Sequence, residues 1–363
     1  MMGFKSFHSA SRRLAGIETM HDQEGATALP RRLAFSHATT STVSTSVDPD
    51  NCRTSSALTG LSRQNRRNAC TLDRPMNTSK NYQFEYVDGQ GRASFRELLD
   101  GFQRDSDVVA RLPDARLDHA YGDLPRQRLD AFPSSTAVRG VLLYLHAGYW
   151  QSRDKALFRW LAPPWQKRGF HVVLANYPLC PDVSLPELVQ ALVPAPAAAH
   201  RLDSQWASLP LVVAGHSAGA HLASEFGLRH GNLPAGDPGR VDGIWALSGI
   251  YDLESLRSTT LNERLRLDGE AARQMSPIHR VGRDGVPAVW HVGNDETPEF
   301  LRQNRAMHDA WRSQGHWSAC VEASGKDHFT VLQGWAALDD GLDTIFENWW
   351  TAVSARHQGA TRT

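Results

Sequence analysis

The sequence lacks a long apolar run, a net charge and a cysteine pattern, and each absence excludes a class of protein. No stretch approaches the roughly 18 consecutive apolar residues of a membrane-spanning helix. Lys and Arg together number 39, as do Asp and Glu, and this balance argues against nucleic acid or a membrane surface as a partner. The four cysteines form no C-x-x-C and no zinc-like spacing. We therefore expect no structural metal and a reducing, cytoplasmic compartment.

Aromatic residues are nearly absent from residues 1–75, which contain three phenylalanines but no tryptophan or tyrosine. This segment is rich in Ser, Thr, Arg and Ala, and it cannot bury enough apolar surface to offset its ordering entropy. We expect it to be disordered. Its Arg and Ser content is typical of a transit peptide, whereas early acidic residues such as Glu18 and Asp22 are not. We favour a mis-assigned start, with Met76 beginning the folded protein.

From residue 76 onward, short apolar segments alternate with helical patterns. This alternation predicts an α/β fold with a mostly parallel central sheet flanked by helices, in one domain over residues 76–355. The polar segment 251–279 lies between two strands and is expected to form a short cap-like insertion, and residues 356–363 to form a disordered tail. Strands are expected at 117–121, 128–132, 138–145, 170–175, 211–214, 243–247, 288–292 and 317–322, and helices at 94–110, 155–168, 185–206 (broken at its prolines), 218–230, 298–314 and up to about 352.

The most informative segment is Gly215-His-Ser-Ala-Gly219, which follows an apolar strand and precedes an Ala-rich helical pattern. This is G-x-S-x-G in the strand–turn–helix context of a nucleophile elbow. The sharp turn exposes Ser217, and the N–H groups that open the helix point at a developing oxyanion. The segment therefore predicts a hydrolase with Ser217 as its nucleophile.

A serine nucleophile requires a base, and the base requires an orienting acid. In this architecture the acid and then the histidine follow the serine along the chain. Asp295 is the first choice of acid because it lies just past the end of the strand at 288–292, and Glu296 and Glu299 are alternatives. His328 lies on the loop after the last expected strand, where the catalytic histidine belongs.

The oxyanion hole needs two backbone N–H donors. Ala218, the residue after the nucleophile, is expected to supply one. The second is expected from Ala147 or Gly148, in the loop His146-Ala-Gly-Tyr-Trp150 that follows the strand at 138–145. This loop is similar to the H-G-G loops of esterases, with Ala147 in place of the first glycine.

These segments together resemble the serine-hydrolase type of kynurenine formamidase (arylformamidase), a family with the α/β-hydrolase fold. The family has H-G-G-Y-W at the oxyanion loop, G-H-S-A-G-A-H-L at the elbow and D-H-F at the histidine. Its acid lies in a D-x-P-E-F-like segment, which Asp295-Glu-Thr-Pro-Glu-Phe300 matches with one extra residue. The resemblance spans roughly residues 80 to 350.

The resemblance implies hydrolysis of N-formyl-L-kynurenine to kynurenine and formate, through a formyl-serine and without cofactor or metal. The partner would then be a small aromatic formamide or ester, and Tyr149, Trp150 and Phe329 are candidates to contact its ring, although each could equally be a packing residue. Two alternatives stay open: a short-chain carboxylesterase with the same triad, and a non-catalytic binding protein on a hydrolase scaffold. A homodimer is left open too.

Overall fold

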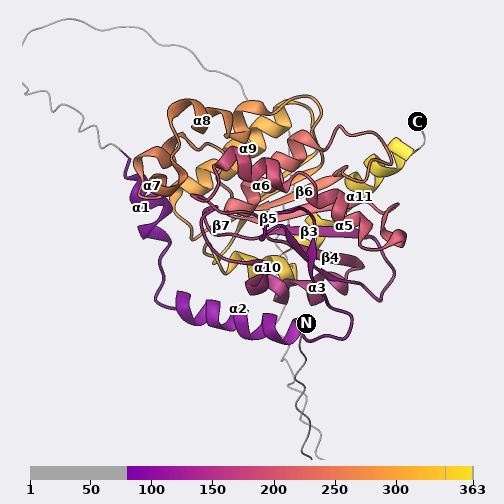
Figure 1. Ribbon diagram of the computed structural model, residues 1–363. Coiled ribbons are helices and arrows are strands. Elements are labelled where there is room, and N and C mark those ends of the chain that lie inside the picture. Colours follow the sequence, from indigo (N-terminus) through magenta and orange to yellow (C-terminus); the bar gives the residue numbers. More distant parts are fainter. Residues whose placement is uncertain (1–79, 340, 362–363) are drawn as a thin grey trace, which may run out of the picture. The chain divides into compact units, whose positions relative to one another are not determined.

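An eight-stranded sheet organises the computed structural model, which describes residues 80–339 and 341–361. The predictions of disorder at 1–75 and of a start at Met76 fall outside these residues. The strand order is β1-β2-β4-β3-β5-β6-β7-β8. β1 and β2 pair antiparallel, β2 pairs antiparallel with β4, and the remaining neighbours are parallel. The predicted mostly parallel sheet is confirmed (Figure 1).

The strands form where the sequence predicted them, with ends shifted by a few residues. The central strands are buried along their whole length, which explains why their sequences are continuously apolar rather than alternating. The strands are β1 (Arg116–Ala120), β2 (Arg128–Phe132), β3 (Gly140–Leu145), β4 (Phe170–Ala175), β5 (Leu211–His216), β6 (Gly243–Leu247), β7 (Ala288–Gly293) and β8 (Ser318–Ala323).

Helices cover both faces of the sheet, and each face has its own apolar core. The first face packs against α4 (Leu185–Leu192), α5 (Ala195–Arg201), α6 (Ala218–Arg229) and α9 (Pro298–Ser313). The second face packs against α2 (Phe95–Val109), α3 (Ala162–Gln166), α10 (Val331–Ala337) and α11 (Leu342–Thr361).

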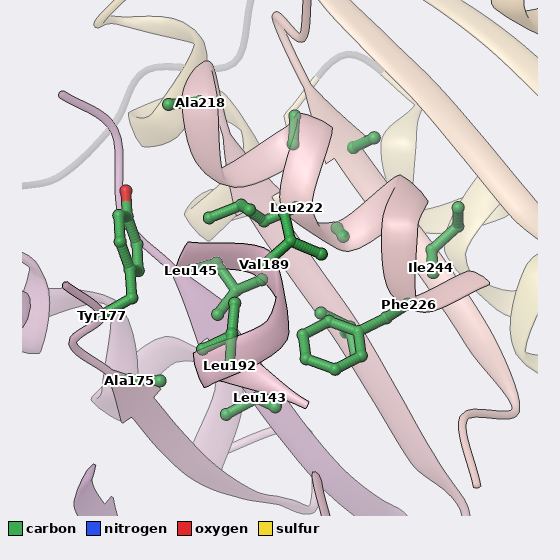
Figure 2. Packing of buried hydrophobic residues seen from close by; sticks show 14 of the residues in the cluster. Leu143, Leu145, Ala175, Tyr177, Val189, Leu192, Ala218, Leu222, Phe226 and Ile244 are labelled. Carbon is green, nitrogen blue, oxygen red and sulfur yellow. The ribbon is translucent and has the colours of Figure 1, made fainter. Parts of the chain in front are cut away.

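Helix α6, which follows the predicted nucleophile, is locked into the first core. Leu222 and Phe226 on this helix face Val189 and Leu192 of α4 and the side chain of Leu143 from β3 (Figure 2). All five side chains are at most 5% exposed. Burying side chains of this size stabilises each by about 1.5–3 kcal/mol, so the position of the α6 N-terminus is set by packing on the sheet.

One predicted helix needs correction, and several short helices were not predicted. Residues 155–168 form a 3-10 helix, η2 (Lys155–Leu161), and then the short α3, because Pro163 and Pro164 cannot donate helical hydrogen bonds. The sequence also gave no signal for α1 (Tyr82–Tyr86), η1 (Asp88–Gln90) or α10. Segment 251–279 is the expected insertion in outline. It contains η4 (Glu254–Ser258), α7 (Asn262–Leu265), α8 (Gly269–Gln274) and the start of η5 (Pro277–Arg280), while η3 (Ser204–Trp206) lies outside it.

The predicted disordered tail at 356–363 is wrong for residues 356–361, because α11 runs to Thr361. The reason is tertiary. The guanidinium of Arg356 donates to the carbonyl of Gly231, and His357 Nδ1 lies 2.9 Å from a carboxylate oxygen of Asp242. In the part of the chain that the structure describes, no helix is long and apolar enough to cross a membrane.

Candidate active site

Ser217 lies at the sharp turn between the end of β5 and the start of α6. Its φ and ψ are 56° and −117°, a conformation that costs a non-glycine residue about 1–3 kcal/mol. The backbone N–H of Ser217 donates to the carbonyl of Leu247, at the end of β6, over 2.8 Å. The sheet therefore holds the serine in the strained conformation of a nucleophile elbow.

The two glycines of the elbow are required by close backbone approaches. A Cβ on Gly215 would lie 2.0 Å from the carbonyl oxygen of Gly219. A Cβ on Gly219 would lie 2.0 Å from the carbonyl oxygen of Leu145, on the neighbouring strand β3. The pattern G-x-S-x-G thus has a steric origin here, because any side chain at either position would displace backbone.

His328 and Glu296 form a buried pair at the C-terminal edge of the sheet. Nδ1 of His328 donates to Oε2 of Glu296 over 2.6 Å, and the two residues are 2% and 5% exposed. The other carboxylate oxygen accepts from Ser248 Oγ at 2.5 Å and from the backbone N–H of Gly293 at 2.8 Å. Because Glu296 accepts the proton on Nδ1, the neutral ring carries no proton on Nε2. Nε2 of His328 is therefore free to act as a base.

The expectation that Asp295 would contact His328 is wrong, and Glu296, one of the two alternatives, occupies that place. Asp295 is exposed because its backbone is held in the turn: its N–H donates to Lys326 O over 3.0 Å, and its carbonyl accepts from Arg92. The carboxylate of the other alternative, Glu299, forms an ion pair with Arg302 on the same helix. A signal existed in the sequence: a D-x-P-E-F-like segment fits without an extra residue when its first position is 296.

The loop that carries His328 is shaped by its neighbours. Oδ1 of Asp327 accepts from the backbone N–H groups of Phe329 and Thr330 at 3.0 and 2.9 Å, which closes a tight turn. On its other side, Nε2 of His216 donates to the carbonyl of His328 over 2.6 Å. Burial, together with the charge of His328, holds the pKa of His216 well below its usual value. A neutral His216 thus ties the elbow to the histidine loop, a role that sequence reasoning missed.

The predicted oxyanion loop follows β3 and has an unusual backbone. Gly148, Tyr149 and Trp150 have φ values of 137°, 52° and 60°, and the two aromatic residues rarely adopt such values. Backbone strain of this kind concentrates at functional sites, where the surrounding structure holds it.

His146 fixes the orientation of the peptide group between Ala147 and Gly148. Its Nδ1 lies 2.8 Å from the carbonyl oxygen of Ala147 and donates to it. Burial lowers the pKa of His146 to about 4, so the ring is neutral and stacks on Tyr177 with ring centroids 4.3 Å apart. In a trans peptide the C=O and the next N–H point in opposite directions. The N–H of Gly148 is therefore directed away from His146.

A cavity of about 230 Å³ lies between this loop and the histidine loop. Two of the three predicted substrate-contacting residues, Tyr149 and Phe329, line it. Trp150 does not line it: its side chain is fully buried in the core, and its ring packs at right angles to that of His221. The remaining lining residues come mainly from the segment before β1, and they are Val87, Gln90, Gly91, Phe95 and Arg153. Within residues 80–339 and 341–361, no cluster of three or more His, Cys, Asp or Glu is placed to hold a metal ion.

The fold and the strained serine turn define an α/β hydrolase. A family model for the alpha/beta hydrolase fold matches residues 142–331, more than half of the chain, and the chain belongs to this family. It is similar to the kynurenine formamidase of Danio rerio, with 29% identity over 249 residues that cover 67% of this chain and 83% of the relative. The kynurenine formamidase of Drosophila melanogaster is 27% identical over 64% of this chain and 81% of the relative.

A solved structure gives the same picture of the fold. The crystal structure of a protein from Silicibacter sp., provisionally named a thioesterase, superposes with a TM-score of 0.64 at 27% identity and covers 76% of this chain and 99% of that one. The chain is therefore a kynurenine formamidase-like α/β hydrolase.

Proposed function

We propose that the protein hydrolyses N-formyl-L-kynurenine to kynurenine and formate, with Ser217, His328 and Glu296 as its catalytic triad. The observation that carries the proposal is the buried 2.6 Å pair between His328 and Glu296 beside the strained serine turn. Similarity to kynurenine formamidases from a fish and an insect supports the choice of an aryl formamide as substrate.

In the proposed mechanism, Nε2 of His328 takes the proton of Ser217 Oγ as the oxygen attacks the formyl carbon. The carboxylate of Glu296 stabilises the imidazolium that forms. His328 then protonates the arylamine nitrogen, and the C–N bond breaks to leave a formyl-serine. Water, activated by the same imidazole, hydrolyses this ester and releases formate.

The tetrahedral oxyanion would be bound by backbone N–H groups. Ala218 opens α6 with an N–H that the helix does not use, and the helix dipole favours negative charge there. The second donor would be Gly148, whose N–H is directed away from His146, with Ala147 as the neighbouring alternative. Removing one such donor typically costs 10²- to 10³-fold in kcat, on the order of 3 kcal/mol.

The cavity between the oxyanion loop and the histidine loop is our candidate site for the aromatic leaving group. A formyl group is the smallest acyl group, so most of the binding energy must come from the aryl part. The cavity, at about 230 Å³, is below the roughly 300 Å³ of common drug-sized sites, and its wall includes the rings of Phe95, Tyr149 and Phe329. Aromatic pairs of this kind contribute about 0.5–1.5 kcal/mol beyond the area that they bury.

The test is kcat/KM on N-formyl-L-kynurenine and on p-nitrophenyl acetate, for wild type, Ser217→Ala and His328→Ala. We expect the formamide to be preferred by orders of magnitude and each variant to lose roughly 10⁶-fold in kcat. Thermal unfolding of each variant controls for folding. Turnover of the ester alone would retain the triad and make the protein a carboxylesterase. A variant with a tenth of wild-type activity would refute the assignment of that residue, and absence of fluorophosphonate labelling at Ser217 would indicate a binding protein.

A further inference from the structure

Arg153 brings a positive charge to the cavity wall. Its guanidinium carbon lies 5.6 Å from the ring centroid of Phe95 and 5.5 Å from that of Phe329. These two rings are themselves in contact, with centroids 4.4 Å apart. The aromatic contacts orient the guanidinium plane but leave its N–H donors without a carboxylate.

The backbone of Arg153 is held in a conformation that positions this side chain. Its φ is 73°, a value that a non-glycine residue adopts at a cost of about 1–3 kcal/mol. The side chain of Arg126 fixes it, with Nη2 donating to the carbonyl of Arg153 over 2.7 Å and Nε donating to the carbonyl of Tyr177 over 2.9 Å. The side chain of Arg126 thus holds the backbone of Arg153 in place.

The acidic side chains on the surrounding segments have other partners. Asp154 accepts from Asn176 Nδ2 at 2.6 Å, and Glu296 is paired with His328 as described above. Asp327 closes its own turn. Among the described residues, no Asp or Glu forms an ion pair with Arg153, and none contributes to the shift in its pKa, which burial lowers. A half-buried arginine without an acidic partner is a candidate site for an anion, because a bound anion offsets part of the cost of removing the guanidinium charge from water.

We propose that Arg153 binds a carboxylate of the substrate, so that the preferred substrates are aryl formamides whose aryl part carries an acidic group. The guanidinium would hold this group in a bidentate pair while the ring stacks beside Phe95 and Phe329. The inference rests on the proposed function, because in N-formyl-L-kynurenine the α-carboxylate is the group that Arg153 would bind. The inference goes beyond the proposed function because it predicts that the cavity prefers substrates with a negative charge.

The experiment compares N-formyl-L-kynurenine with its α-carboxamide, which removes the negative charge and little else. Wild type should prefer the carboxylate by about 10- to 100-fold in kcat/KM, the range expected for a hydrogen bond to a charged group. Arg153→Gln should lower kcat/KM on the carboxylate by about this factor more than on the carboxamide and so abolish the preference, and Arg153→Lys should retain part of it. The matched control is Arg92→Gln, which removes a nearby positive charge that pairs with Asp327 instead.

Two results would overturn the inference: no preference in the wild type, or an equal loss on both substrates in Arg153→Gln, which would indicate a purely structural role. If Arg92→Gln lost as much of the preference for the carboxylate as Arg153→Gln, the preference would come from the overall positive potential around the cavity rather than from Arg153.

A second readout separates this inference from the proposed function. L-Kynurenine and its carboxamide are tested as competitive inhibitors of p-nitrophenyl acetate hydrolysis, an assay that needs no formamidase activity. Stronger inhibition by the carboxylate, lost in Arg153→Gln, would support the anion site even if no formamide were hydrolysed. Equal inhibition by both compounds would refute it even if the formamide were a good substrate.

Discussion

Glu296→Gln tests the triad most directly, because Asp295→Asn makes the same carboxylate-to-carboxamide change at the neighbouring residue and serves as a matched control. The carboxylate of Glu296 accepts the Nδ1 proton of His328 over 2.6 Å. A carboxamide oxygen can still accept from Ser248 and Gly293, which leaves its NH₂ group facing Nδ1. The imidazole must then carry its proton on Nε2, where it cannot accept the serine proton.

The expected loss in kcat is roughly 10⁴-fold, which is the cost of the wrong tautomer in a serine triad and corresponds to about 5.4 kcal/mol. Asp295→Asn should keep a rate close to wild type, because its side chain is exposed. The assay is single-turnover kinetics on the formamide, with urea unfolding to verify that both variants are folded. A near-normal rate in Glu296→Gln, or a large loss in Asp295→Asn with an intact fold, would refute the assignment.

Two further predictions concern stability. Ser217→Gly should be inactive but about 1 kcal/mol more stable than Ser217→Ala, because glycine adopts a φ of 56° without the strain that alanine retains; equal free energies of unfolding would contradict the strained turn. The hydrogen bond that His357 donates to the carboxylate of Asp242 raises the pKa of His357 against the effect of burial, so this pair stabilises the fold fully below about pH 6.5 and less as the pH rises through the raised pKa. The loss of stability in His357→Gln should therefore be larger near pH 6 than near pH 9 in urea unfolding, and a loss independent of pH would count against the pair.

Local pattern was enough for much of the fold. All eight strands lie where the sequence predicted them, and the central ones were marked by apolar runs because a strand buried on both faces is apolar throughout. The short helices of the N-terminal segment were missed because α1 has only five residues and no apolar period to detect. The end of α11 was missed for a different reason: it is stabilised by Arg356 and His357, whose partners lie more than a hundred residues away in the chain.

The sequence by itself determined the position of the proposed nucleophile, since the strand–turn–helix pattern around Ser217 and the two glycines that the tight turn requires are local features. It also located the histidine of the proposed triad, because the order of strands brings the loop after β8 to the same edge of the sheet. The position after the strand did not distinguish Asp295 from Glu296, which are neighbours in one turn, and only the spacing of the D-x-P-E-F-like segment favoured 296. Only the tertiary structure decided this, through the hydrogen bond from Asp295 N–H to Lys326 that turns one carboxylate outward and the next one inward. The cavity was equally hidden, because its walls come from segments that are adjacent only after folding, so that no local pattern records which side chains will share it.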